Sequence, residues 1–123
     1  MELSKAEKKL MQLLWKMKRA YMKDILEAYP EPKPAPTTVA TLLKRMTDKG
    51  FISYEKRGSV REYYPLVNKA VYFKKQLGEM ISNYFDGSPT EFASFFAESA
   101  EMSQKELETL REIIDQQLKN REE

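Results

Sequence analysis

The 123-residue sequence predicts a mainly α fold of the α+β class, in which one β hairpin lies between two groups of helices. Two observations lead to this prediction. In most segments the apolar residues recur at intervals of three and four, which is the spacing of one face of a helix. Between residues 51 and 64 the pattern changes to two short runs rich in aromatic and β-branched residues, separated by a glycine turn, which is typical of paired strands.

The chain is expected to begin with two helices. Ser4 and Glu7 have the spacing of a capping box, so the first helix should start there. Its apolar face should consist of Ala6, Leu10, Leu13, Leu14 and Met17, with Trp15 to one side. A second, short helix is expected from Met22 to Ala28 and has to end before Pro30. Four prolines in the seven residues after Tyr29 predict a stiff connection without helix.

A third helix should follow the prolines, capped by Thr37 and Thr38 and ended by Gly50 in the left-handed conformation. Its inward stripe has helical spacing and consists of Val39, Leu42, Leu43 and Met46. This placement turns outward Thr37, Thr41, Lys44 and Asp48, with Thr38 and Arg45 on the flanks. The outer face is therefore polar, with short side chains in its first turn and basic ones further along.

The hairpin is expected to pair residues 51–56 with residues 60–64 across a turn of Arg57, Gly58 and Ser59, and Pro65 ends the second strand. Tyr63 and Tyr64 point to opposite sides of their strand, so one of them should pack on the third helix. The order of helix, helix, helix, strand, turn and strand is that of a winged helix-turn-helix domain, which we place at residues 1–67.

Residues 68–123 are predicted to form three short helices. The first begins at Asn68, ends at Asp86 and Gly87, and carries the stripe Phe73, Leu77, Met80, Ile81 and Tyr84. The second begins at a capping box of Ser88 and Glu91 and turns inward Phe92, Phe95 and Phe96. The third begins at a capping box of Ser103 and Glu106 and carries the stripe Leu107, Leu110, Ile114 and Leu118.

These three helices need a surface to cover their apolar stripes, because an isolated amphipathic helix is marginal in water. The simplest such surface is a second copy of the same region. We therefore interpret residues 68–123 as a C-terminal helical dimerisation region that forms a twofold homodimer. The phenylalanines of the second helix should be part of this packing, and a small-molecule pocket is the less favoured interpretation.

Charge is distributed unevenly along the chain. Residues 1–75 contain 17 Lys and Arg against 8 Asp and Glu, a net charge of +9. Residues 76–123 contain 4 against 11, a net charge of −7, and the whole chain has a net charge of +2. A basic half suits a partner such as DNA, because each phosphate that it neutralises releases condensed counterions. An unevenly charged but merely solvated surface is the alternative interpretation.

The sequence lacks residues that several classes of function need. The chain has no cysteine and no histidine, which removes disulfides and the commonest metal ligands and general bases. We therefore expect no cofactor, no metal site and no enzyme activity. No apolar run approaches the roughly 20 residues of a membrane span, so no membrane insertion is expected. The first residues also lack the apolar segment of a secretory signal, and the lack of cysteine suits a cytoplasmic location.

Two groups of residues are candidate contacts to double-stranded DNA. On the third helix, Thr37, Thr38 and Thr41 lie near the N-terminus, where the helix dipole favours phosphate. Lys44 and Arg45 are residue types that reach guanine edges or the DNA backbone. In the hairpin, the turn at Gly58 is surrounded by Lys56, Arg57 and Arg61, as a minor-groove or phosphate contact requires. The alternative is that the threonines only cap the helix and the basic side chains are solvated.

Several segments, in their order along the chain, resemble one known family. They are Leu3 to Glu7 with Leu14 and Trp15, Thr38 to Met46 with Lys49 to Ile52, Arg61 to Pro65, and Ser103 to Leu107 with Leu110 to Ile114. Together these segments extend over nearly the whole chain. They are similar to the penicillinase-repressor (BlaI/MecI) family of winged-helix transcriptional repressors.

The resemblance implies a homodimer whose winged-helix domains each read one half of a palindromic operator and repress transcription, in one branch of the family that of antibiotic-resistance genes. The family's base and phosphate contacts correspond to Thr37, Thr38, Thr41 and Arg45. Ala40 stands where some members have arginine.

The resemblance also bears on how repression ends. In the antibiotic-resistance branch a membrane sensor-protease pathway leads to cleavage of the repressor before a phenylalanine. The matching bond joins Phe95 and Phe96, and Phe95 replaces the asparagine of those members. The copper-responsive branch uses cysteine pairs near the C-terminus, which this chain lacks.

A different class of function stays open from the sequence, namely a winged-helix protein–protein interaction module without DNA binding. Charge reversal at the basic positions of the third helix and hairpin distinguishes the two hypotheses. It should abolish DNA binding but need not disturb a protein interface elsewhere.

Overall fold

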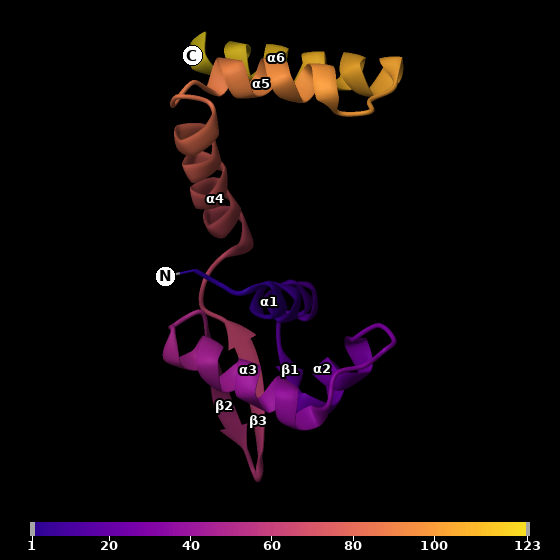
Figure 1. Ribbon diagram of the computed structural model, residues 1–123, viewed down its shortest axis with the longest axis vertical. Helices are drawn as coiled ribbons and strands as arrows, with labels where there is room; N and C mark the ends of the chain where they lie inside the picture. The colour runs from indigo at the N-terminus through magenta and orange to yellow at the C-terminus, as the bar shows by residue number, and fades with distance from the viewer. Residues whose placement is uncertain (1, 123) are drawn as a thin grey trace. The chain divides into compact units, whose positions relative to one another are not determined.

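The structure is a computed structural model that describes residues 2–122. The chain forms two compact units that divide between Lys74 and Lys75 (Figure 1). The first unit contains α1 (Lys5–Met17), β1 (Ala20–Tyr21), α2 (Met22–Ala28), α3 (Pro36–Asp48), β2 (Ile52–Arg57) and β3 (Val60–Pro65). The second unit contains α5 (Pro89–Ser99) and α6 (Gln104–Glu122), and α4 (Lys69–Tyr84) begins in the first unit and ends in the second. The predicted mainly α fold with a small sheet is confirmed.

The sheet of the first unit has three antiparallel strands in the order β1-β3-β2. The predicted hairpin is β2 and β3, which extend as a ribbon beyond α3 (Figure 1). Strand β1, in which Ala20 lies opposite Tyr63, was not predicted from the sequence. A strand of two residues shows no alternation of apolar and polar side chains, and it exists because β3 offers a free edge to pair with.

Helix α1 begins as predicted but turns a different set of side chains inward. The capping box is present, since the Ser4 amide donates to Glu7 Oε1 at 2.8 Å and the Glu7 amide donates to Ser4 Oγ at 3.2 Å. The buried residues are Glu7, Leu10, Met11 and Leu14. Ala6 is exposed, so its predicted inward position is wrong. The buried stripe begins one residue later, and it includes Glu7 because Lys49 neutralises this carboxylate.

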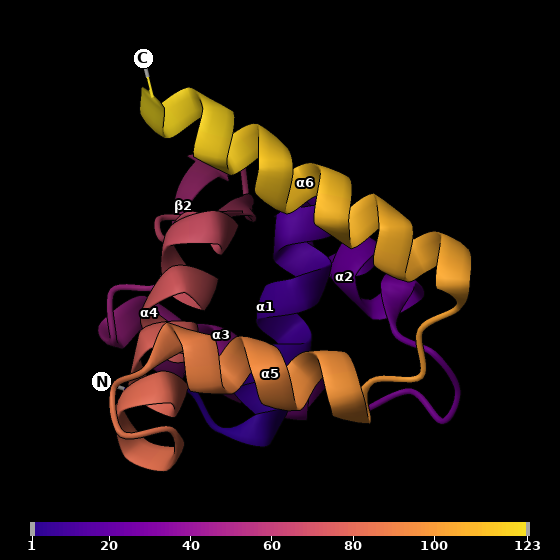
Figure 2. The same ribbon diagram turned by 90° about the horizontal axis from the view of Figure 1, so that it is seen from above.

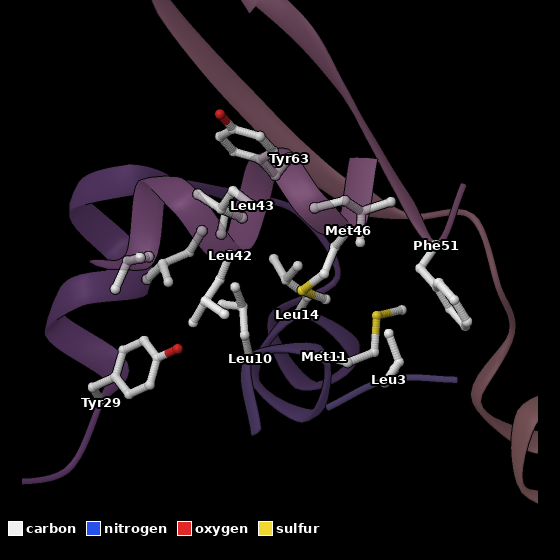
Figure 3. Packing of buried hydrophobic residues seen from close by; sticks show 14 of the residues in the cluster. Leu3, Leu10, Met11, Leu14, Tyr29, Leu42, Leu43, Met46, Phe51 and Tyr63 are labelled. Atoms are coloured by element: carbon white, nitrogen blue, oxygen red, sulfur yellow. The ribbon is translucent and has the colours of Figure 1, made fainter. Parts of the chain in front are cut away.

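The core of the first unit lies between α1, α2, α3 and the sheet (Figure 3). The predicted inward stripe of α3 is confirmed, because Val39, Leu42, Leu43 and Met46 are all buried. Side chains that precede helices and strands complete the core, including Leu3 before α1 and Phe51 before β2. The opposite face of α3 is therefore left to solvent.

Helix α3 begins earlier than expected. Ala35 occupies the N-cap position without a side-chain hydrogen bond, and Pro36 is the first helical residue. The prediction that Thr37 and Thr38 cap the helix is therefore wrong. Proline is favoured at this position because the first helical amide has no partner within the helix. Gly50 follows the helix with a φ of 82°, as predicted for its end.

Trp15 joins the winged-helix elements to the first turns of α4. Its Nε1 donates a hydrogen bond to the Val67 carbonyl at 2.8 Å. Its ring lies 5.4 Å from the ring of Tyr72 and 5.8 Å from that of Phe73. Phe73 therefore packs within the first unit, whereas the sequence analysis placed it in the apolar stripe of the dimerisation region.

The second unit has no buried residue on α5 or α6 among the residues that the structure describes. Phe92 is half-buried, but Phe95 and Phe96 are 57% and 41% exposed, so their predicted inward orientation is wrong within one chain. Helices α5 and α6 run in different directions from the loop that joins them (Figure 2). Helices α4 and α6 have 16 and 19 residues, and α4 lies within the predicted span from Asn68 to Asp86.

Candidate nucleic-acid interface

The outer face of α3 presents every residue that the sequence analysis assigned to it. The exposed side chains are Thr37, Thr38, Thr41, Lys44, Arg45 and Asp48, together with Ala40. The Thr41 hydroxyl donates to the Thr37 carbonyl at 3.0 Å, which holds one threonine of the first turns in a fixed rotamer. The threonines lie at the N-terminal end of the helix, where the dipole attracts phosphate.

Two basic residues extend this face toward the end of α3. Lys44 pairs with Asp48 one turn later, at 3.1 Å between Nζ and Oδ2. Arg45 has no ion pair within residues 2–122, and its side chain points into solvent. Arg45 is therefore the cation of α3 that can meet a DNA base or phosphate without first leaving a carboxylate.

The hairpin divides the predicted basic residues between its two faces. Lys56 lies opposite Arg61 in the strand register, and Tyr54 lies opposite Tyr63. Because side chains alternate along a strand, these four residues share one face, which is the face directed at α3. A groove runs between this face and α3, and it is lined by Ala40, Lys44, Thr47, Asp48, Tyr54, Arg61 and Tyr63.

Arg61 is held in this groove by an aromatic ring. Its guanidinium lies 4.3 Å from the centroid of Tyr54, and the two tyrosine rings of this face are 5.6 Å apart. A cation above an aromatic face loses fewer rotamers when it binds an anion than a free arginine does. The guanidinium of Arg61 is therefore a preorganised positive charge beside α3.

Arg57 lies on the other face of the hairpin, away from α3. It pairs with Glu55 at 3.2 Å and with Glu62 at 3.4 Å. Arg19, which precedes β1, binds the same two carboxylates at 2.9 Å each. The hydrogen bond from Arg19 holds the pKa of Glu62 below its ordinary value, so this network stays charged. The structure therefore separates Arg57 from Lys56 and Arg61, which the sequence analysis grouped together.

The role of Arg19 was not predicted from the sequence. Its guanidinium covers the ring of Tyr64 at 4.5 Å, so Tyr64 supports the outer face while Tyr63 is buried toward α3. The predicted opposite orientation of the two tyrosines is thereby confirmed. Arg19 contacts residues more than 30 positions away, and no pattern of neighbouring residues in the sequence predicts such contacts.

An ion pair beneath α3 fixes the helix against α1. Lys49 Nζ lies 2.7 Å from Glu7 Oε1 and donates to the Glu2 carbonyl at 3.2 Å. Burial by itself would raise the pKa of Glu7, but the hydrogen bonds from Lys49 and Ser4 outweigh it and lower the pKa. Glu7 is thus ionised at neutral pH and anchors the last turn of the helix that carries Arg45.

The remaining predicted residues lie in the second half of the chain. The Phe95–Phe96 bond is inside α5, within a cluster in which Phe85 contacts Phe92 and Phe95 at 5.5 Å between ring centroids. The proposed dimerisation residues are solvent-accessible on α4, α5 and α6, namely Leu77, Met80, Tyr84, Phe92, Phe95, Phe96, Leu107, Leu110, Ile114 and Leu118.

Within residues 2–122 no group of three or more acidic side chains is arranged to hold a metal ion. None of the helices that the structure describes is long and apolar enough to cross a membrane. The outer face of α3 and the groove beside the hairpin, where exposed threonines and basic side chains gather, are the candidate functional surface.

A comparison with known families identifies this combination of elements. The family model named penicillinase repressor matches residues 3–116. The chain belongs to the penicillinase-repressor family. The resemblance found in the sequence is therefore confirmed.

Characterised relatives within the penicillinase-repressor family extend over almost the same length. The methicillin resistance regulatory protein MecI of Staphylococcus aureus (strain N315) is 32% identical over 115 residues, which are 93% of this chain and 94% of MecI. The penicillinase repressor of Bacillus licheniformis is 24% identical over 121 residues, which are 98% of this chain and 94% of that protein.

The first unit also resembles a solved structure. The DNA-binding domain of the repressor BlaI matches with a TM-score of 0.52 and 26% identity, over 58% of this chain and 88% of that domain. This match and the family membership together identify the protein as a winged-helix, DNA-binding transcriptional repressor.

Proposed function

We propose that this penicillinase-repressor family member binds a palindromic duplex operator as a homodimer and represses genes of antibiotic resistance or a related response. The single observation that carries the DNA contact is that α3 and the Lys56–Arg61 face of the hairpin converge on one groove. The names of MecI and of the penicillinase repressor support the class of regulated gene.

The proposed contacts follow from this placement. Thr37, Thr38, Thr41 and Arg45 on α3 enter the major groove and read the sequence. Lys44, Lys56 and Arg61 bind phosphates on either side of the groove, in the way that basic side chains set the register of a protein on DNA. Arg57 contributes less, because Glu55 and Glu62 already neutralise it.

The homodimer is proposed because the second unit cannot bury its own apolar surface. Leu118, Ile113 and Ile114 on α6 are between 51% and 60% exposed, and Phe95 on α5 is 57% exposed. Apolar stripes of this extent on consecutive helices are typical of protein interfaces. A twofold dimer places two copies of α3 about one DNA turn apart, which requires half-sites spaced by roughly 10 base pairs or a multiple.

We also propose that the repressor is released from DNA through a membrane sensor-protease pathway. Phe95 and Phe96 are exposed, which favours access of a protease to their side chains. Their peptide bond is inside α5, however, and local unwinding has to precede cleavage because an intact helix holds its backbone in hydrogen bonds. Mass spectrometry of the protein after induction would identify the cleaved bond.

A binding assay tests the operator hypothesis. The protein should shift inverted-repeat duplexes selected from random DNA, and the affinity should fall steeply as salt is raised, because phosphate contacts release counterions. No salt-dependent binding down to about 50 mM salt would contradict DNA binding.

Charge reversal separates this hypothesis from a protein interaction module. Lys44→Glu, Arg45→Glu and Arg61→Glu should each abolish binding to the selected duplex. The thermal unfolding of the protein should stay nearly unchanged, because all three positions are exposed. Retained DNA binding in all three variants would mean that DNA binds at another surface, whereas an unaltered protein that binds no DNA would favour the interaction module.

A further inference from the structure

The groove between α3 and the hairpin contains a carboxylate among its cations. Lys44 and Arg61 line it from opposite walls, and Asp48 lies beside Lys44 at the end of α3. Lys44 Nζ is 3.1 Å from Asp48 Oδ2, and the two side chains are 78% and 65% exposed. The lysine on the α3 wall is therefore already occupied before any ligand arrives, whereas Arg61 is held by a neutral ring.

Geometry suggests which part of a DNA duplex would face this groove. The major groove that receives a recognition helix and the neighbouring minor groove are separated by one sugar-phosphate strand. If α3 enters the major groove and the hairpin approaches the adjacent backbone or minor groove, that strand has to run between them. Its phosphates then meet Lys44 from one side and Arg61 from the other, and they also meet the carboxylate of Asp48.

We propose that the groove takes this phosphate strand and that Asp48 competes with it for Lys44, which holds the affinity for DNA below what the cations alone would give. The inference rests on the proposed function. Because a phosphate is the same at every step of the duplex, Asp48 lowers the affinity for all sequences alike and plays no part in reading bases. It thus sets how tightly the repressor holds DNA, while Arg45 sets where.

Two physical effects give the size of the expected change. An exposed ion pair is worth roughly 0.2 to 1 kcal/mol, so removing the competitor should strengthen binding about 1.4- to 5-fold for each protomer. In the unaltered protein, Lys44 displaces a counterion from DNA when it binds a phosphate. The carboxylate of Asp48, which Lys44 has left, then attracts a cation from solution, and this uptake offsets the release. Removing that carboxylate should steepen the dependence of log affinity on log salt by up to about 0.9 for each protomer.

The test is a DNA titration of Asp48→Asn over a range of salt concentrations, with a selected inverted-repeat duplex and a random-sequence duplex as the two probes. Glu31→Gln is the matched control, because it removes one exposed negative charge from the same unit without touching the groove. We expect Asp48→Asn to bind both probes more tightly by the same factor and Glu31→Gln to bind as the unaltered protein does.

A double-variant cycle then asks whether Asp48 acts through Lys44. In a Lys44→Ala background, the gain from Asp48→Asn should largely disappear, because no lysine is left to release. Three results would overturn the inference: no gain beyond that of Glu31→Gln, an equal gain with and without Lys44, or a changed preference at one base pair. The absence of salt-dependent binding by the unaltered protein would instead overturn the proposed function, and the inference with it.

Discussion

Arg45 and Lys44 are neighbours on α3, yet their surroundings give them different roles. Lys44 is paired with Asp48, whereas Arg45 has no ion pair within the described residues. A planar guanidinium with free donors can bind the two acceptors of guanine, and a lysine engaged by a carboxylate is better suited to a phosphate. At this scale the type of each side chain and its neighbours together support the proposed division between base reading and backbone binding.

We therefore expect Arg45→Ala to weaken binding to the selected duplex by about 1 to 3 kcal/mol and to relax the preference at a single base pair. The measurement is a set of titrations against duplexes that are altered at one position at a time. Lys56→Ala is the contrasting variant, because a lost phosphate contact should weaken all these duplexes alike. An Arg45→Ala protein with the same uniform loss would contradict a base-reading role.

Glu7 gives the fold a pH dependence whose sign follows from its lowered pKa. The ordinary carboxyl pKa of 4.5 describes the unfolded chain, and the folded value is lower. The ion pair with Lys49 therefore stabilises the fold fully above pH 4.5, and this contribution is lost as the pH falls through the folded pKa.

At pH 7 we expect Glu7→Gln to lower the free energy of unfolding by about 1.5 to 3 kcal/mol, the contribution of hydrogen bonds to a charged group. Urea denaturation at pH 7 and at pH 3 measures this difference, which should shrink at the lower pH because the contribution of the ion pair is lost as the pH falls below 4.5 and through the lowered pKa of Glu7. A difference that is equal at both pH values would show that packing, and not charge, is what Glu7 contributes.

The hairpin shows at the scale of an element how strand alternation sorts residues that are neighbours in sequence. Arg57 and Lys56 are adjacent, but one faces the acidic network of Glu55 and Glu62 and the other faces α3. A cluster of basic residues in the sequence therefore contains both a structural cation and candidate DNA contacts.

This division leads to a comparison of Arg61→Ala with Arg57→Ala. We expect the first to weaken DNA binding and to reduce the slope of log affinity against log salt by about 0.9 for each protomer, through one lost phosphate contact. The second should leave that slope unchanged. Equal effects of the two variants on the slope would mean that both faces of the hairpin meet the DNA.

The elements differ in how well local patterns predict them. Helix α3 and its buried stripe were predicted because Val39, Leu42, Leu43 and Met46 repeat with helical spacing. The start of α3 was misplaced because Thr37 and Thr38 are good caps, while Pro36 takes the first helical position. Strand β1, which was not predicted, has only two residues and depends on its partner β3.

For the whole molecule, the first unit has a closed core and the second exposes its apolar stripes. The first unit buries residues from α1, α2, α3 and the sheet around Leu10, Leu14 and Leu43. Helices α5 and α6 bury none among the residues described. This contrast is what a DNA-binding unit joined to an oligomerisation unit would give.

Ile114→Glu tests the dimer. Ile114 is 51% exposed in a single chain, so a charge there should cost little in the isolated chain but should be strongly unfavourable inside an apolar interface. We expect a shift from dimer to monomer by analytical ultracentrifugation, together with loss of cooperative binding to two half-sites. Gln116→Glu is the control on the same helix, and a dimer that persists in Ile114→Glu would rule out α6 as its interface.

Local spacing was enough to predict the mainly α fold, the hairpin and the buried stripe of α3, because amphipathic periods and caps are properties of neighbouring residues. The family came from the resemblance of ordered sequence segments to its members. Contacts between distant residues had to come from the folded chain. Pairing of β3 with β2 put Lys56 and Arg61 beside α3 and Arg57 behind it. Packing also joined Glu7 to Lys49 and brought Arg61 and Asp48 to one groove. No spacing in the sequence encodes these contacts, because they depend on the positions of separate elements in space.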